Sequence, residues 1–124
     1  MLQEYINERY PELSHMSDQA EELYKAAGFN IASYFYGFFT WKACGDALII
    51  GDIFTSKQWR PHRYAWSLFY DIKRLAKDLD KHVIIGLTEP NGVNQYLGVV
   101  AMKASKFKQA YETPKLVIWI RGVN

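Results

Sequence analysis

The sequence predicts an α/β domain, in which a mixed β-sheet carries helices on both faces. Segments with helical periodicity alternate along the chain with short apolar runs that are typical of buried strands. One helix beginning at Pro61 lies between the apolar runs Ala47–Thr55 and His82–Leu87, and such a crossover predicts a parallel pair of strands. The chain has 124 residues, the length of a single domain. We expect N-terminal helices over about residues 1–28 and the sheet with its crossover helices over about residues 30–122.

The N-terminal segment predicts two helices. The first begins near Leu2 and stops near Pro11, because a proline interrupts helical hydrogen bonding. The second begins at Ser17 or Asp18, where a capping residue precedes an apolar stripe, and it ends before Gly28.

Two strands should follow these helices. The aromatic-rich segment Asn30–Trp41 predicts one strand, and Lys42–Asp46 predicts a hairpin turn. The apolar run Ala47–Thr55 then predicts a buried strand with a bulge at Gly51–Asp52.

The second half of the chain alternates helix and strand. The helix from Pro61 has an apolar face, and His82–Leu87 is a continuous apolar run, as in a central strand that is covered on both faces. We expect a helix over Asn94–Lys106 with Asn94 as its cap, and a last strand over Lys115–Gly122. The apolar face of the Pro61 helix comprises Ala65, Leu68, Phe69, Ile72, Leu75, Ala76 and Leu79.

Composition excludes several classes of protein. A net charge of +2 argues against a molecule that is basic throughout, so any electropositive function must come from a local patch. The single cysteine, Cys44, excludes an internal disulfide framework, and His15 and His82 have no partners at metal-ligand spacing, so we expect no metal site. No apolar run has the length of a membrane span or of a signal peptide, so we expect a cytoplasmic protein.

The stretch Ser56–Trp66, SKQWRPHRYAW, concentrates basic and aromatic residues between a buried strand and the start of a helix. A helix N-terminus favours an anion, and Arg60 and Arg63 could contact a phosphate there. They could equally belong to a solvated helix start. Interleaved aromatic and basic residues also suit single-stranded nucleic acid, but no nucleic-acid-binding signature supports that function.

The order of elements from about residue 17 onward, together with this loop, resembles the GNAT superfamily of acetyl-CoA-dependent N-acyltransferases. In that family the loop between a strand and the next helix carries Q/R-x-x-G-x-G/A. The segment from Arg60 to Ala65 matches that spacing at both ends, and Arg63 stands in place of the central glycine. The family also has an asparagine after the next strand, which Asn94 matches.

The resemblance implies acetyl-CoA as the cofactor and an amine, on a small molecule or a protein, as the acceptor. It implies that the backbone of Ile53, Phe54 and Thr55 pairs with the pantetheine arm. Asp52 is the candidate general base. The alternative is that Asp52 is only a residue of the bulge and has no catalytic role. The implied contacts to the phosphates and the rest of the coenzyme come from Arg60, Arg63, Tyr64, Ala65 and Asn94.

Two departures from the family pattern keep a second hypothesis open. Arg63 replaces a glycine, and Ala101 stands where the family has the tyrosine that protonates the leaving thiolate, which leaves Tyr96 as the nearest candidate acid. The chain could therefore be a catalytically degenerate GNAT-like protein that acts in assembly or as a binding component, with a protein partner or as a homo-oligomer. Short chains of this kind resemble those of tailed bacteriophages, which would make the protein virion-associated.

Overall fold

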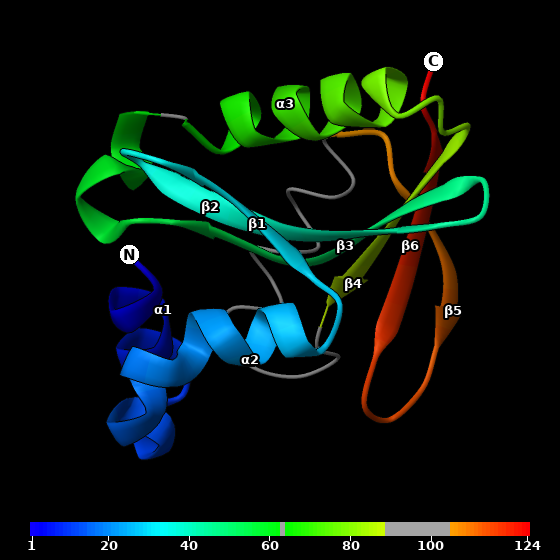
Figure 1. Cartoon of the computed structure of the whole chain (residues 1–124). Helices are drawn as coiled ribbons and strands as arrows, with labels where there is room; N and C mark the ends of the chain where they lie inside the picture. Colours follow the sequence, from blue (N-terminus) through cyan, green and yellow to red (C-terminus); the bar gives the residue numbers. More distant parts are fainter. Residues whose placement is uncertain (63, 89–104) are drawn as a thin grey trace.

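The computed structural model of the chain describes residues 1–62, 64–88 and 105–124. Within them, strands form a mixed sheet in the order β1-β2-β3-β4-β6-β5, in which β3 and β4 run parallel and the other neighbours run antiparallel. Helix α3 (Tyr64–Asp78) covers one face, while α1 (Leu2–Arg9) and α2 (Ala20–Ala26) lie on the other (Figure 1). The predicted fold class is confirmed. The strands are β1 (Asn30–Tyr34), β2 (Gly37–Cys44), β3 (Ala47–Thr55), β4 (Val83–Thr88), β5 (Lys108–Glu112) and β6 (Val117–Gly122).

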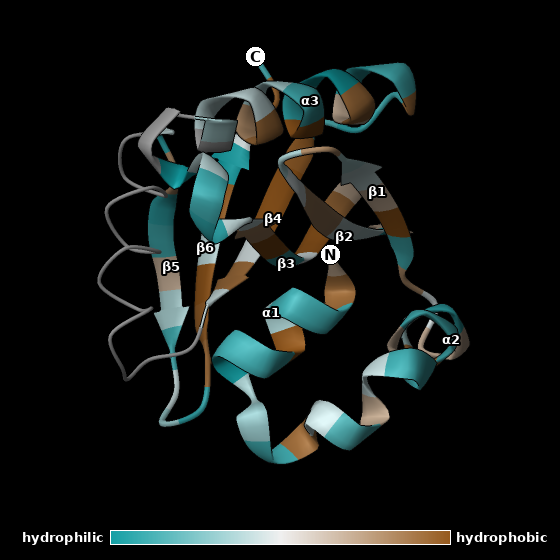
Figure 2. Cartoon of the chain, turned by 90° about the vertical axis from the view of Figure 1, so that its left-hand side faces the viewer, coloured by the Kyte–Doolittle hydropathy of each residue, from teal (hydrophilic) through white to brown (hydrophobic). Residues whose placement is uncertain are grey.

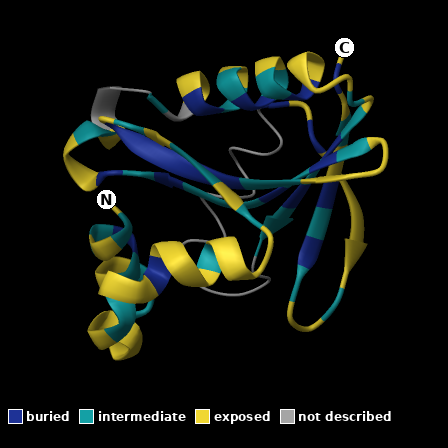
Figure 3. Ribbon diagram, viewed as in Figure 1, coloured by how far each residue is buried: buried dark blue, intermediate teal, exposed yellow. Residues whose placement is uncertain are grey.

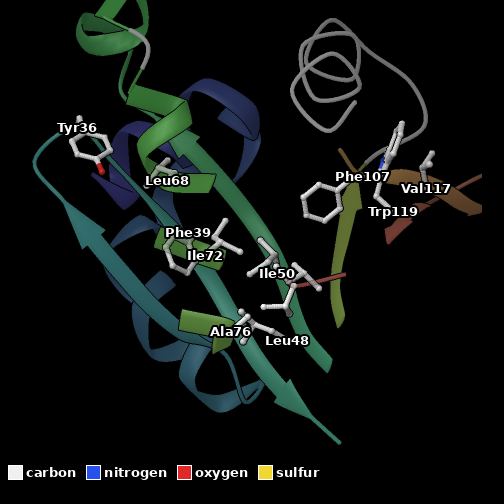
Figure 4. Packing of buried hydrophobic residues seen from close by; sticks show 12 residues of the cluster. Tyr36, Phe39, Leu48, Ile50, Leu68, Ile72, Ala76, Phe107, Val117 and Trp119 are labelled. Carbon is white, nitrogen blue, oxygen red and sulfur yellow. The ribbon is translucent and has the colours of Figure 1, made fainter. Parts of the chain in front are cut away.

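The main core lies between α3 and the sheet. Leu68, Ile72 and Ala76 have exposed fractions of 0%, 1% and 0%, and their spacing of four residues puts them on one face of α3. They share one buried cluster with Leu48 and Ile50 of β3 (Figure 4). The apolar face predicted for this helix is therefore confirmed at these positions, whereas Leu79, which was also predicted to belong to it, is 38% exposed and lies beyond the end of α3. Figure 3 shows the same division, with burial concentrated in the central strands and on the side of α3 that faces them.

A smaller core attaches α1 to the opposite face. Tyr5 of α1 forms a buried cluster with Phe38 of β2 and Phe54 of β3. The ring of Tyr5 meets each phenylalanine edge to face at a centroid distance of 5.3 Å. Figure 2 shows the hydrophobic strands between α3 on one side and α1 on the other.

The N-terminal prediction is right for the first helix and wrong for part of the second. α1 ends at Arg9, before Pro11, as predicted. The following segment is a 3₁₀ helix, η1 (Pro11–Gln19), and regular α-helix begins only at Ala20. Ser17 and Asp18 lie inside η1. A 3₁₀ turn often precedes an α-helix, so the capping signal did not mark where regular α-helix begins.

The segment Asn30–Trp41 is a hairpin and not one strand. β1 and β2 are antiparallel and meet at a tight turn over Phe35–Tyr36. A Cβ atom added at Gly37, directly after this turn, would lie 2.2 Å from the carbonyl oxygen of Phe54. That glycine permits the close approach of β3, and it was the available signal for the turn.

The C-terminal third also departs from prediction in part. The last strand is confirmed as β6, but the additional strand β5 was not predicted, because its residues are exposed along its whole length and lack apolar alternation. Most of the helix predicted over Asn94–Lys106 lies outside the described residues, and Ser105 and Lys106 form a turn. In the described part of the chain, no helix has the length and apolar character needed to cross a membrane.

Candidate active site

The two parallel strands at the centre of the sheet separate halfway along their length. β3 and β4 pair from Ala47 opposite Val83 to Ile50 opposite Gly86, and the pairing stops there although both strands continue. The rest of β3 stays hydrogen-bonded to β2 on its other edge, ending at Thr55 opposite Gly37. One backbone edge of β3 thus turns away from β4, and an extended chain with amide groups could pair with such an edge.

The predicted pantetheine residues lie on this divergent half of β3. Phe54 is buried with an exposed fraction of 1% and packs under α1, whereas Ile53 packs on the side of α3. Side chains alternate across a strand, so Ile53, Phe54 and Thr55 would offer a ligand their backbone groups and not their side chains.

A β-bulge begins the divergent half. Trp41 lies opposite Ile50 and Phe39 opposite Ile53, so Gly51 and Asp52 together oppose the single residue Thr40. The predicted bulge is confirmed. The backbone N–H of Asp52 donates to Thr40 Oγ1 at 2.9 Å, and this hydroxyl donates in turn to Asp52 Oδ2 at 3.0 Å. The irregular backbone therefore aims the Asp52 carboxylate toward the α1 face.

Asp52 is engaged by the N-terminal helices. The Tyr5 hydroxyl donates to Asp52 Oδ1 at 2.5 Å. Burial, followed by the negative charge of Asp52, raises the pKa of Tyr5, and the same two causes raise the pKa of Tyr24 in α2. The tyrosines therefore keep their protons, and Asp52 acts as the acceptor. This arrangement fastens α1 to the bulge, and the role of Asp52 as a general base stays a prediction.

Arg60 lies in the 3₁₀ helix η2 (Lys57–His62), which precedes α3. Its Nε donates to the carbonyl oxygen of Thr55 at 3.0 Å, and its guanidinium lies over the ring of Phe54 at 5.5 Å. Its Nη2 donates to both carboxylate oxygens of Glu8 in α1, at 2.6 and 2.7 Å. Arg60 is thus placed at the end of β3 as predicted, with its guanidinium held by the chain itself.

The other predicted loop residues divide into two groups. Tyr64 opens α3, and its ring stacks on Tyr36 at 4.5 Å and meets Phe35 edge to face at 5.3 Å, so the ring braces the β1–β2 turn. Trp59 joins this aromatic cluster, while Trp66 is 52% exposed. Arg63, Asn94 and Tyr96 lie outside the described residues, as does the side chain of Ala65.

Three residues that form hydrogen bonds at this end of the molecule were not predicted as site residues, namely Glu4, Glu8 and Ser56. Glu4 of α1 accepts hydrogen bonds from the Ser56 hydroxyl, and Glu8 holds Arg60. An open pocket of about 750 Å³ lies here, between α1 and the β3–α3 connection. The residues lining it are Met1, Gln3, Glu4, Asn7, Glu8, Lys57 and Arg60. The spacing of Glu4 and Glu8 predicts that they share a helix face, but not which segment that face meets.

His82 and Cys44 lie away from this site. His82 Nδ1 lies 2.6 Å from Asp46 Oδ1 on the surface, and the hydrogen bond to Asp46, together with its charge, raises the pKa of His82. Cys44 is exposed in β2. Within the described residues, no group of three or more histidine, cysteine or acidic side chains could hold a metal ion.

Comparison with known proteins identifies the fold. No family model matches the sequence, and no curated protein matches it. Among solved structures, an aminoglycoside 6'-N-acetyltransferase complexed with coenzyme A has a TM-score of 0.73 at 11% identity, covering 99% of this chain and 89% of that one. The PaiA N-acetyltransferase of Thermoplasma acidophilum, in complex with coenzyme A, has a TM-score of 0.68 at 12% identity, covering 96% and 78%.

A third structure supplies the name of the fold family. It is a Desulfovibrio desulfuricans protein assigned to the GNAT family of acetyltransferases, with a TM-score of 0.67 at 12% identity, covering 92% of this chain and 83% of that one. The TM-scores of these structures establish a shared fold, whereas sequence identities this low leave the activity of this chain open. This chain is therefore a divergent domain with the fold of the GNAT acetyltransferases.

Proposed function

We propose that this chain is an N-acyltransferase that transfers an acetyl group from acetyl-CoA to an amine on a small molecule or a protein. The observation that carries the proposal is the separation of β3 from β4 after Ile50 and Gly86, beside the bulge at Asp52. This separation frees a strand edge next to an acidic side chain. A thioester arm and an acceptor amine could meet there.

The residues at the end of β3 suit an anionic cofactor. Ser56, Lys57 and Arg60 already donate hydrogen bonds to carboxylate oxygens, so their geometry accommodates negatively charged oxygen atoms. In the proposal this segment, with Arg63, Tyr64, Ala65 and Asn94, holds the phosphates and nucleotide of the coenzyme. The backbone of residues 53–55 aligns the pantetheine arm.

The chemistry would divide between positioning and proton transfer. Bound acetyl-CoA would supply the acetyl thioester, so that a C–N bond forms while the C–S bond breaks. The acceptor amine must lose a proton, and Asp52 is the proposed base. The leaving thiolate must gain one, for which Tyr96 is the proposed donor. Holding both reactants in one cleft accounts for much of the rate enhancement in such a reaction.

Calorimetric titration of the protein with acetyl-CoA and CoA tests the proposal. We expect binding of both, and release of free thiol from acetyl-CoA when a panel of amines is added. An Asp52→Asn variant should retain binding and lose thiol release. Absence of binding at millimolar concentration would exclude the enzyme.

A second candidate function is a GNAT-like protein without catalysis that serves as a binding or assembly component. The observation in its favour is that carboxylates of the chain itself already engage Ser56, Lys57 and Arg60, the donors that would face the cofactor if the chain were an acyltransferase. This candidate predicts no binding of acetyl-CoA. It also predicts an oligomer in size-exclusion chromatography with light scattering, or a protein partner in a pulldown.

A further inference from the structure

Two acidic side chains of α1 reach the connection between β3 and α3. Glu4 and Glu8 are four residues apart, so they project from one face of the helix. The Ser56 hydroxyl donates to both oxygens of Glu4 at 2.8 and 2.9 Å, and the backbone N–H of Lys57 donates to one of them at 3.2 Å. Arg60 donates to both oxygens of Glu8. The carboxylates thus engage three different kinds of donor.

These donors are the kinds that bind phosphate. A hydroxyl, a backbone N–H at the start of a helical turn and a guanidinium provide charge-assisted hydrogen bonds to phosphate oxygens. Here all three lie in the connection that follows β3, and Lys57 and Arg60 line the same 750 Å³ pocket as Glu4 and Glu8. We propose that Glu4 and Glu8 occupy the anion-binding part of the cofactor site and make its phosphate groups compete with α1. This inference rests on the proposed function.

The position of α1 does not depend on these two carboxylates. The buried ring of Tyr5 and its hydrogen bond to Asp52 hold the helix against the sheet. Glu4 and Glu8 can therefore rotate away from the loop while the helix stays in place. No rearrangement of the core is required.

The electrostatic contacts are weak enough to be displaced. The side chains of Arg60 and Glu8 are 38% and 30% exposed, and ion pairs with this much solvent contact contribute little to stability. A pyrophosphate carries more charge than one carboxylate and offers more acceptor atoms. The acidic pair should therefore lower the affinity for such a ligand without abolishing binding.

The test compares three proteins by isothermal titration calorimetry at one ionic strength. They are the wild type, a Glu4→Gln/Glu8→Gln variant, and a Glu12→Gln/Glu22→Gln control that makes the same change in net charge at two exposed positions. The probes are inorganic pyrophosphate and CoA. We expect the first variant to bind pyrophosphate roughly three- to tenfold more tightly than the wild type, and the control to change by less than about twofold. Glutamine preserves side-chain size, and thermal unfolding checks that each variant is folded.

The outcomes separate this inference from the proposed function. If pyrophosphate binds to none of the three proteins, or if the control tightens binding as much as the first variant, then the inference is wrong. If the first variant binds pyrophosphate more tightly than the wild type does, but CoA binds no more tightly than pyrophosphate, then the inference about Glu4 and Glu8 holds and the proposed acyltransferase function is wrong. If CoA binds to all three proteins with equal affinity and each releases free thiol from acetyl-CoA in the amine assay, the acyltransferase stands and the inference fails.

Discussion

Replacement of Tyr5 by phenylalanine should destabilise the protein through the loss of one hydrogen bond. The Tyr5 hydroxyl lies 2.5 Å from Asp52 Oδ1, and the residue is only 2% exposed, so water cannot replace the lost partner. The ring and its contacts with Phe38 and Phe54 remain, so no cavity forms. Hydrogen bonds to a charged acceptor contribute about 1.5–3 kcal/mol, and we expect the free energy of unfolding to fall by about that amount.

Urea unfolding at pH 7, followed by tryptophan fluorescence, measures this loss. In a chain of 124 residues the melting temperature should fall by roughly 5–12 °C. Tyr111→Phe is the matched control, since Tyr111 is 61% exposed on β5, and it should change stability by less than about 0.5 kcal/mol. In an Asp52→Ala background, Tyr5→Phe should leave the free energy of unfolding almost unchanged. Equal costs with and without Asp52 would refute the assignment of this hydrogen bond.

The same pair predicts a dependence of stability on pH. Burial, and then the charge of Asp52, raise the pKa of Tyr5 in the folded state above the ordinary value of 10.0. The unfolded state therefore loses the tyrosine proton first as pH rises. The contribution of Tyr5 is fully present below pH 10 and is lost above it, toward the raised pKa of the folded state. Stability between pH 9 and 11 should decline less steeply in Tyr5→Phe than in the wild type.

Two further predictions concern residues outside this pair. The hydrogen bond to Asp46, together with its charge, raises the pKa of His82. This pair therefore stabilises the fold below the ordinary histidine pKa of 6.5, and the stabilisation is lost as pH rises through the raised pKa of the folded state. The urea midpoint of His82→Gln should differ from that of the wild type at pH 5.5 and match it at pH 8.5. An added Cβ at Gly51 would lie 2.9 Å from a ring carbon of Phe29, so Gly51→Ala should cost about 1–3 kcal/mol in urea unfolding. Gly122→Ala, where a Cβ meets nothing within 4 Å, is its control, and equal losses in the two variants would contradict the steric explanation.

Local signals in the sequence were sufficient for much of the sheet and for α3. The spacing of Leu68, Ile72 and Ala76 predicted the buried face of that helix, because a helix repeats every 3.6 residues whatever lies against it. The apolar run at His82–Leu87 similarly predicted a central strand, and the glycine beside Asp52 predicted the bulge. The loop at Arg60 was correctly placed after a buried strand for the same reason.

Other features depend on contacts between distant segments. The turn at Phe35–Tyr36 lacks a conventional turn sequence and is braced by Tyr64 from α3. Strand β5 has no apolar alternation, and its pairing with β6 decides its conformation. Apart from Gly37 beside the turn, the local sequence carries no signal for these two features, since the stabilising partner of each lies elsewhere in the chain.

The candidate site likewise combines features that local sequence predicts with features that depend on contacts between distant segments. By itself, the sequence determined that a basic loop follows a buried strand and that an acidic residue lies in a bulge, because both are properties of neighbouring residues. Only the tertiary structure decided that Tyr5 donates to Asp52 and that Glu4 and Glu8 engage Ser56 and Arg60, across sequence separations of 47 and 52 residues. The physical reason is that helix α1 could present any of its faces to the sheet. The burial of the Tyr5 ring against the sheet selects the face that meets the loop.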